Sequence, residues 1–464
     1  MFIGREEERA RLENLWAGKG LRVAVLYGRR RVGKTALIRH FLQDKPGVFF
    51  TASSNSAALN VENLRHAMVL SGLFAPEKVE DAPMKAMKGT LESLFSHSAE
   101  MPFVLVMDEY PYLARALPEL STELAGLALA HAEKSRLLLI LSGSQLSFME
   151  EHVLGAQSPF QALSPIAIKL APLDFFTLRR HFDLFRSEDA IRLYGIIGGT
   201  VQYLSWFGGA RDVRQILVEH VLNPGSRLFE EPGHLLRQEV REGAVYNGIL
   251  SAIASGAERL CDIAERTGLE TGACSLYLNR LITLDLVRKE HPAGEENSRK
   301  TLYVVEHPLF RFLFRYIPQN LSTLTLGCTE PVLDLIAKDE PSYLHYVFAA
   351  ICRQWMHARQ RSDPSLQTFG RIGRYWGTNP KTRAQIYLDV AARDEACGML
   401  CGKSFWGREP VQKAHVESFL AMCRGLNAQR YFVFATAGFA DDCKALEYEK
   451  LSLVSLDDML SRFP

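Results

Sequence analysis

Glycine, lysine and threonine occur between residues 28 and 35 at a spacing that suits phosphate binding. The segment reads Gly-Arg-Arg-Arg-Val-Gly-Lys-Thr. Its glycines allow the backbone to turn with N–H groups directed inward, and the helix that follows adds further donors. Lys34 can reach the β- and γ-phosphates of a nucleotide, and the Thr35 hydroxyl can bind Mg²⁺. The predicted nucleotide contacts are Gly28, Arg29, Arg30, Arg31, Val32, Gly33, Lys34, Thr35 and Ala36.

Further polar residues follow two apolar runs later in the chain. Residues 103–107 are followed by Asp108 and Glu109, and residues 137–141 lead to Ser144. The carboxyl ends of parallel strands meet at one edge of a sheet, so we expect these side chains beside the phosphates. There Asp108 would join the Mg²⁺ shell, Glu109 would orient the attacking water, and Ser144 would meet the γ-phosphate or that water. The predicted catalytic residues are Lys34, Asp108, Glu109 and Ser144.

The elements that must position these groups are short apolar runs alternating with helical segments. We expect strands at 23–27, 48–52, 102–109, 136–144 and 166–170. This alternation is typical of an α/β fold with a parallel sheet. The ligand would then lie at the carboxyl ends of the strands.

Composition limits the remaining possibilities. The chain has 464 residues, enough for about three modules, and a net charge of +1. This balance excludes a global electrostatic attraction to nucleic acid or to an anionic membrane. The charged amino terminus and the lack of a long apolar run predict a cytoplasmic protein with no membrane segment. The eight cysteines form no C-x-x-C pair, and we interpret Cys397 and Cys401 as small residues in or near a strand rather than metal ligands.

Four segments together resemble a known family. They are Phe2-Ile3-Gly4-Arg5-Glu6, the phosphate loop, Met-Asp-Glu-Tyr-Pro-Tyr-Leu at 107–113 and Leu-Ser-Gly-Ser at 141–144. The chain resembles the prokaryotic AAA-related ATPases of the signal-transducing (STAND-like) group, whose archaeal-type members carry a winged helix and a restriction-endonuclease-like domain. The resemblance implies ATP as the nucleotide, Phe2, Gly4 and Arg5 at the adenine site, and Ser144 as the sensor.

The resemblance also implies the order of domains. A P-loop NTPase parallel sheet would be followed by a helical lid, a winged helix-turn-helix and an α/β restriction-endonuclease-like domain. The expected ranges are 1–175 for the ATPase core, 176–240 for the lid, 241–324 for the winged helix and 325–464 for the nuclease-like domain.

Two departures from the family pattern bear on hydrolysis. Leu163 stands where the family has an arginine, and such an arginine can be worth about 10³–10⁵ in turnover. We expect at least two of the three loop arginines at 29–31 to face solvent rather than to replace it. Residues 198–201 read Gly-Gly-Thr-Val and lack the family's proline. The missing arginine predicts slow hydrolysis, and the missing proline weakens the expected second nucleotide sensor.

Three helical segments at 245–253, 260–267 and 273–281, with strands at 286–289 and 302–305, predict the winged helix-turn-helix. Candidate DNA contacts are Arg280, Arg288 and Lys289. Only Arg280 is a cation on the expected recognition helix, and the hairpin also carries several glutamates. Two interpretations therefore stay open: contact with DNA, or a packing module that docks a protein partner.

The carboxyl-terminal region resembles nucleases that place an Asp on one strand and Glu-x-Lys on the next. Asp389 and Lys403 match this pattern, but Cys401 occupies the position of the glutamate. A further family glutamate, on the preceding helix, is Ala349 here. One carboxylate holds Mg²⁺ poorly and a thiol is a weak substitute, so we predict a degenerate nuclease site at Asp389, Cys401 and Lys403.

The leading hypothesis is a cytoplasmic ATP-binding switch, with slow Mg-dependent hydrolysis, that controls the winged-helix and nuclease-like domains. One alternative is an ATP-regulated DNA nuclease of mobile-element or defence type. Another is a winged-helix DNA-binding regulator with little catalysis. Oligomerisation is compatible with each of them.

Overall fold

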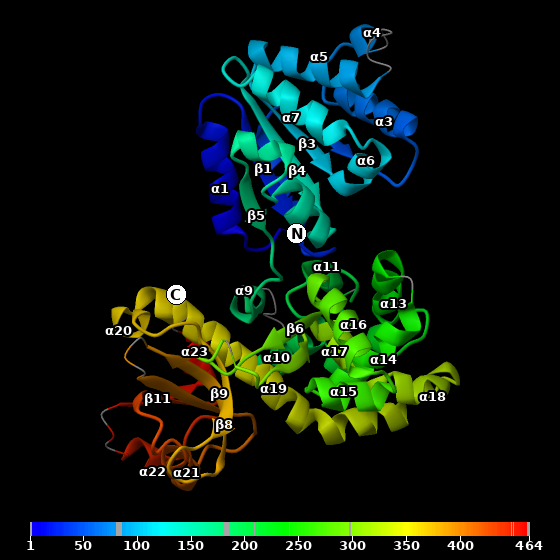
Figure 1. The fold of residues 1–464 in the computed structure, drawn as a ribbon. Coiled ribbons are helices and arrows are strands. Elements are labelled where there is room, and N and C mark those ends of the chain that lie inside the picture. Colours follow the sequence, from blue (N-terminus) through cyan, green and yellow to red (C-terminus); the bar gives the residue numbers. More distant parts are fainter. Residues whose placement is uncertain are drawn as a thin grey trace. The chain divides into compact units, whose positions relative to one another are not determined.

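The computed structural model consists of two compact units (Figure 1). It describes residues 2–79, 86–180, 185–207, 209–210, 212–240, 242–296, 298–394, 396, 398–446, 448 and 450–461, excepting the side chains of 78 and 444. The first unit comprises residues up to Pro172 together with Thr200–Gln202. The second comprises Leu173–Gly199 and the chain from Tyr203 onward. No helix within these residues combines the length and the apolar content needed to cross a bilayer.

A five-stranded parallel sheet in the order β2-β3-β4-β1-β5 forms the centre of the first unit. Its strands are β1 (Arg22–Tyr27), β2 (Gly47–Thr51), β3 (Phe103–Asp108), β4 (Leu137–Gly143) and β5 (Ile166–Lys169). All residues of β3 and β4 are buried, as expected of strands covered on both faces. The predicted parallel α/β sheet is confirmed, with strand ends within a residue or two of those expected.

Alternate residues of β1 pack on opposite sides of this sheet. Val23 and Val25 belong to one apolar cluster, and Ala24 and Leu26 belong to the other. The helices of the unit are α1 (Glu6–Ala17), α2 (Lys34–Phe41), α3 (Ala57–Leu70), α4 (Pro76–Val79), α5 (Met87–Glu100), α6 (Tyr110–Ala116), α7 (Leu120–Ala130) and α8 (Leu146–Phe148). Short helical turns cover Leu42–Asp44, Met149–Val153 and Pro159–Leu163. Helices α1 and α2 contribute to the Ala24 cluster, and α3, α5 and α7 contribute to the Val23 cluster.

Helices also begin the second unit. They are α9 (Phe175–Arg179), α10 (Ser187–Ile197), α12 (Val213–Ile216), a π-helical turn at Leu217–Val221 and α13 (Arg227–Glu239), while α11 (Val201–Leu204) begins in the first unit and ends in the second. The expectation that residues 176–240 form a lid on the ATPase core stays a prediction. Within the second unit α10 packs on α19 (Glu330–Ser362), where Tyr343 donates to the Gly195 carbonyl at 2.7 Å and Gln354 donates to the Tyr194 hydroxyl at 2.9 Å. The apolar face of α10, which includes Leu193 and Ile197, is buried there.

Three helices and a hairpin follow. They are α14 (Gly243–Ala254), α15 (Leu260–Thr267), α16 (Thr271–Thr283), β6 (Val287–Glu290) and β7 (Leu302–Val305). The hairpin is antiparallel, and Gly268 adopts a φ of 67° between α15 and α16. An apolar cluster containing Ile249, Ile263 and Leu278 joins the three helices. These are the elements that the predicted winged helix-turn-helix requires, although its assignment stays a prediction.

A mixed five-stranded sheet in the order β12-β11-β10-β9-β8 forms the end of the chain. Its strands are β8 (Gly373–Thr378), β9 (Gln385–Arg393), β10 (Met399–Phe405), β11 (Ala428–Ala435) and β12 (Leu451–Ser455). Strands β8 to β10 are antiparallel neighbours, and β10 to β12 are parallel. The accompanying helices are α17 (Pro308–Tyr316), α18 (Leu321–Thr325), α19 (Glu330–Ser362), α20 (Pro364–Gln367), α21 (Lys413–Met422), α22 (Asp441–Lys444) and α23 (Leu456–Ser461).

Candidate nucleotide site

The phosphate loop connects the end of β1 to the start of α2. A Cβ atom on Gly28 would lie 2.4 Å from the Leu170 carbonyl oxygen, so only glycine fits there without displacing the backbone. Gly33 has a φ of 101°, a conformation that glycine adopts readily, and it immediately precedes α2. The N-terminus of this helix therefore points toward the loop, which favours an anion.

Lys34 is a buried cation whose hydrogen-bond acceptors are neutral. Its side chain donates to the Gly28 carbonyl at 2.9 Å and to the Arg29 carbonyl at 3.1 Å. The residue is only 6% exposed. Burial lowers the pKa of Lys34 to about 8, although the nearby charges of Glu109 and Asp108 oppose this shift. A phosphate group would supply the negative charge that this ammonium lacks.

Thr35 and Asp108 meet directly across the end of the sheet. The Thr35 hydroxyl donates to Asp108 Oδ2 at 2.9 Å, and Asp108 is 3% exposed at the end of β3. A hydroxyl and a carboxylate are hard oxygen ligands of the kind that Mg²⁺ prefers. The described residues contain no cluster of three or more His, Cys, Asp or Glu side chains suited to a metal. This donor set fits a Mg²⁺ ion that takes its other ligands from phosphate and water.

Glu109 and Ser144 form the second pair of the site. Ser144 Oγ donates to Glu109 Oε2 at 2.7 Å, and Ser144 is buried just beyond β4. Glu109 has a φ of 53° at the junction between β3 and α6. Strained backbone of this kind is often found where a side chain must be aimed at a reacting group. The structure thus brings together the four residues predicted to be catalytic and Thr35: Asp108 pairs with Thr35, Glu109 pairs with Ser144, and Lys34 lies at the same loop.

The three loop arginines are all half-buried. Arg30 donates to the Tyr112 hydroxyl on α6, and its charge contributes to the low pKa of Lys34. Arg29 and Arg31 also interact with other groups. The expectation that at least two of them are solvent-facing loop cations stays a prediction. Val32 is buried in the cluster beneath the loop, and Ala36 is exposed on α2.

The amino-terminal segment lies against the loop and α2. Arg5 is 8% exposed, and its guanidinium donates to the Val32 carbonyl at 3.0 Å and to the Ala171 carbonyl at 2.6 Å. Phe2 stacks on His40 of α2 at 4.3 Å between ring centroids. Gly4, with a φ of 63°, makes the turn between them. The predicted adenine-site residues are thus beside the loop, although Arg5 is already occupied in holding its backbone.

Comparisons with known proteins agree with this geometry. Residues 2–207 match a family described as an ATPase domain predominantly from Archaea. The chain carries an archaeal-type P-loop ATPase domain. Residues 313–411 match a second family, of archaeal and bacterial proteins of unknown function. The first match supports the prediction of ATP as the nucleotide.

Individual relatives extend over much of the chain. An uncharacterized protein of Methanocaldococcus jannaschii is 27% identical over 410 residues, which cover 85% of this chain and 88% of the relative. An uncharacterized ATP-binding protein of the same organism is 51% identical over 45 residues, 10% of this chain and 76% of the relative. The Walker-type ATPase of Pyrococcus abyssi superposes with a TM-score of 0.53 and 21% identity over 68% of this chain and 96% of its own. This structural likeness shows the fold of the ATPase domain.

The positions that depart from the family pattern have local roles in packing. Leu163 ends the 3₁₀ turn at Pro159–Leu163 and packs, partly buried, against the core of the ATPase domain.

In the second unit, a Cβ atom on Gly199 would lie 1.8 Å from the Leu173 carbonyl oxygen. Gly198 has a φ of 61°. This close backbone approach explains the glycine at position 199, and nothing in the structure explains Val201 in place of the expected proline.

The predicted degenerate nuclease site is only partly assembled. Asp389 is 1% exposed and accepts hydrogen bonds from Lys403 at 3.1 Å and from the Ser404 amide at 3.0 Å. His345, on α19, lies 3.3 Å from the other carboxylate oxygen. Cys401 instead lies in the apolar cluster beside Cys423, so its inclusion in the site is corrected. Cys397 lies outside the described residues.

The sequence analysis did not single out His345. This residue lies one helical turn before Ala349, the position where the family of nucleases has a glutamate. Burial would raise the pKa of Asp389, but the hydrogen bond from His345 and the charge of Lys403 hold it at about 2. The carboxylate is therefore ionised and already paired. This arrangement favours a buried ion-pair cluster over a metal site.

The candidate DNA contacts are not equally available. Arg280 is exposed and donates to the Glu239 carbonyl at 3.3 Å. Arg288 is bound to the carboxylates of Glu290 and Glu306. Lys289 is exposed on β6. Because the two glutamates already neutralise the charge of Arg288, the geometry gives little support to DNA binding through the β6–β7 hairpin.

Proposed function

We propose that the ATPase domain binds Mg-ATP at the loop of residues 28–35 and hydrolyses it slowly. The nucleotide state would act as a switch for the second unit. The observation that carries the proposal is the convergence of Lys34, the Thr35–Asp108 pair and the Glu109–Ser144 pair at one end of the parallel sheet.

Each residue has a chemical role in this proposal. The loop N–H groups and Lys34 hold the phosphates, while Thr35 and Asp108 hold Mg²⁺ directly or through water. Mg²⁺ would neutralise charge on the phosphates when bound. Glu109 accepts a hydrogen bond from the attacking water and so orients it, and Ser144 positions the Glu109 carboxylate.

Slow turnover follows from Leu163. An apolar side chain packed at this position supplies no positive charge to the transferred phosphoryl group, whose transition state depends on such charge. Binding can persist without this cation because the loop, Lys34 and Mg²⁺ already hold the nucleotide. ATP would therefore serve as a conformational ligand before it serves as a fuel.

Calorimetric titration of the full chain with ATP, in the presence and absence of Mg²⁺, tests the binding step. Lys34→Ala should weaken binding by about 100-fold, because a buried charge-assisted contact is lost. Lys134→Ala, which removes an exposed lysine outside the site, is the matched control and should bind like the wild type. Equal affinity in Lys34→Ala and in the wild type would contradict the proposed site.

The switch requires that ATP and ADP have different effects on the second unit. Backbone hydrogen exchange of residues 173–461, measured with saturating Mg-ATP and then with Mg-ADP, should differ in Glu109→Gln, which holds ATP without hydrolysing it. Lys34→Ala should remove the difference. Identical exchange in the two nucleotide states would limit the proposal to an ATPase without a switch.

A further inference from the structure

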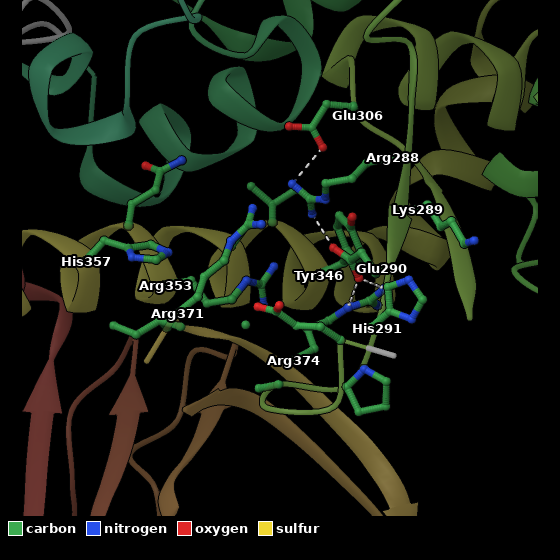
Figure 2. A pocket seen from close by; sticks show the side chains of 18 of the residues that line it. Arg288, Lys289, Glu290, His291, Glu306, Tyr346, Arg353, His357, Arg371 and Arg374 are labelled. Carbon is green, nitrogen blue, oxygen red and sulfur yellow. Dashed lines mark hydrogen bonds and ion pairs between the residues drawn. The ribbon is translucent and has the colours of Figure 1, made fainter. Parts of the chain in front are cut away.

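A polar cavity of about 640 Å³ lies within the second unit (Figure 2). It is bounded by β6 and the hairpin loop, by α19, and by the segment that leads into β8. Six basic side chains line it, against three glutamates. The basic residues are Arg288, Lys289, Arg311, Arg353, Arg371 and Arg374, and the glutamates are Glu290, Glu296 and Glu306.

Two of the three glutamates are already paired. Arg374 donates to Glu290 at 2.6 Å, and Arg288 also binds this carboxylate. The other guanidinium nitrogen of Arg288 lies 2.8 Å from Glu306. Burial alone would raise the pKa of Glu290, but the charges of Arg374 and Arg288 hold it at about 2, so it stays ionised. These pairs neutralise one side of the cavity.

The opposite side carries cations without an acidic partner. Arg353 is 9% exposed, and its guanidinium donates to the Asp389 carbonyl, a neutral acceptor, at 2.7 Å. Arg371 is exposed to the cavity. In the part of the chain that the structure describes, neither arginine has a carboxylate within 4.0 Å. His357, one helical turn from Arg353 on α19, also lines this side.

A buried cation is costly unless an anion pairs with it. Burial lowers the pKa of Arg353, and the charge of Glu290, which is hydrogen-bonded to Arg374, opposes this shift only in part. Glu290 and Glu306 are committed to Arg288 and Arg374, and Glu296 is exposed, so an anion from outside the chain can supply the charge that pairs with Arg353. Figure 2 shows the side chains of Arg353, Arg371 and Arg374 gathered around the same space.

We propose that this cavity binds a small phosphate-bearing molecule whose phosphate group pairs with Arg353 and Arg371. Guanidinium groups bind phosphate in a bidentate manner, and a doubly charged phosphate matches two unpaired arginines better than a single carboxylate does. The volume lies within the range of small-molecule sites. Arg353 is too deeply buried for the backbone of a DNA duplex, whereas a phosphate on a small molecule can enter.

The test uses the full chain carrying Lys34→Ala, which removes the lysine of the phosphate loop, and inorganic pyrophosphate as the probe. Isothermal titration at low ionic strength should show saturable binding with one site per chain. Adding Arg371→Ala should weaken this binding at least about tenfold, because one charge-assisted contact is lost.

Arg371 is exposed, so this variant should fold normally. Arg361→Ala, an exposed arginine on α19 outside the cavity, is the control and should not change the affinity.

A second variant, Arg353→Lys, keeps the buried charge but removes the planar fork, and it should also weaken pyrophosphate binding. The proposal is overturned if pyrophosphate at millimolar concentration does not bind saturably, or if Arg371→Ala and Arg361→Ala bind it equally well. It is also overturned if a short DNA duplex displaces pyrophosphate and loses affinity in Arg371→Ala, because the arginines would then serve a nucleic acid.

Discussion

Lys34 shows how single residues of this site depend on a ligand. Its ammonium is buried against two carbonyls, and its pKa is about 8 rather than the usual value near 10.5. Near pH 8 a substantial fraction of the chains therefore carries neutral Lys34. Nucleotide phosphates stabilise the charged form and raise this pKa, so binding must draw a proton from solution.

We therefore expect proton uptake when ATP binds at about pH 8.5. Titration calorimetry in two buffers with different ionisation enthalpies measures it as a difference in apparent binding enthalpy. The uptake should vanish in Lys34→Arg, whose guanidinium stays protonated at this pH. Uptake of the same size in that variant would assign the proton to another group.

Asp389 gives a second prediction for a single residue. Its pKa is about 2 in the folded chain and near 3.8 when unfolded, so its ionised form stabilises the fold above about pH 4. This contribution is lost as the pH falls from about 4 toward 2. Asp389→Asn should lower the free energy of unfolding by about 2 kcal/mol at pH 6, and the difference from the wild type should shrink near pH 2.

Urea denaturation of both proteins at several pH values would measure that difference. A constant difference across the pH range would mean that packing rather than charge is responsible. The same variant separates the ion-pair interpretation from the nuclease hypothesis. Metal-dependent nicking of DNA by the wild type, abolished in Asp389→Asn, would favour the nuclease.

At the scale of elements, the phosphate loop is held by close contact with the segment after β5. Gly28→Ala should displace the loop, because the new methyl group would lie 2.4 Å from the Leu170 carbonyl oxygen. We expect ATP affinity to fall at least about tenfold. Gly126→Ala is the matched control, since Gly126 lies in α7 with open space around its Cβ position and alanine favours helix there. Titration with ATP would compare the two, and an undiminished affinity in Gly28→Ala would contradict a rigid loop.

Elements with strong local signals could be predicted from the sequence. The apolar runs of β1, β3 and β4 are buried on both faces, and the glycine spacing marks the turn before α2, so the sheet and loop were both found. The meeting of Asp108 with Thr35 and of Glu109 with Ser144 was also predictable, because the loop after β1 and the carboxyl ends of β3 and β4 share one edge of a parallel sheet. The roles of these residues stay predictions.

Other features depend on tertiary packing and had no clear local signal. Helix α19 continues through Pro341, although proline normally interrupts a helix. Two residues earlier on the same helix, Asp339 accepts hydrogen bonds from Arg315 and Tyr316. Strand β12 is short and lies at the edge of its sheet, so its few apolar residues give little signal for a strand in the sequence. The contacts of Arg5 with Ala171 and of His345 with Asp389 join distant parts of the chain, which no spacing rule could reveal.

At the scale of the whole molecule, the near balance of charges conceals local differences. The net charge is +1, yet one cavity of the second unit carries twice as many basic as acidic side chains. The nucleotide loop lies in the other unit. Each unit thus offers basic side chains to an anionic ligand, and the nucleotide site is the one supported by family membership.

ATP turnover, measured together with ATP binding, tests the central claim most directly. We expect slow phosphate release by the wild type, unaltered ATP binding but no release by Glu109→Gln, and loss of both in Lys34→Ala. Lys134→Ala should match the wild type in both measurements. Turnover that survives in Glu109→Gln, or ATP binding that survives in Lys34→Ala, would contradict the account of this site.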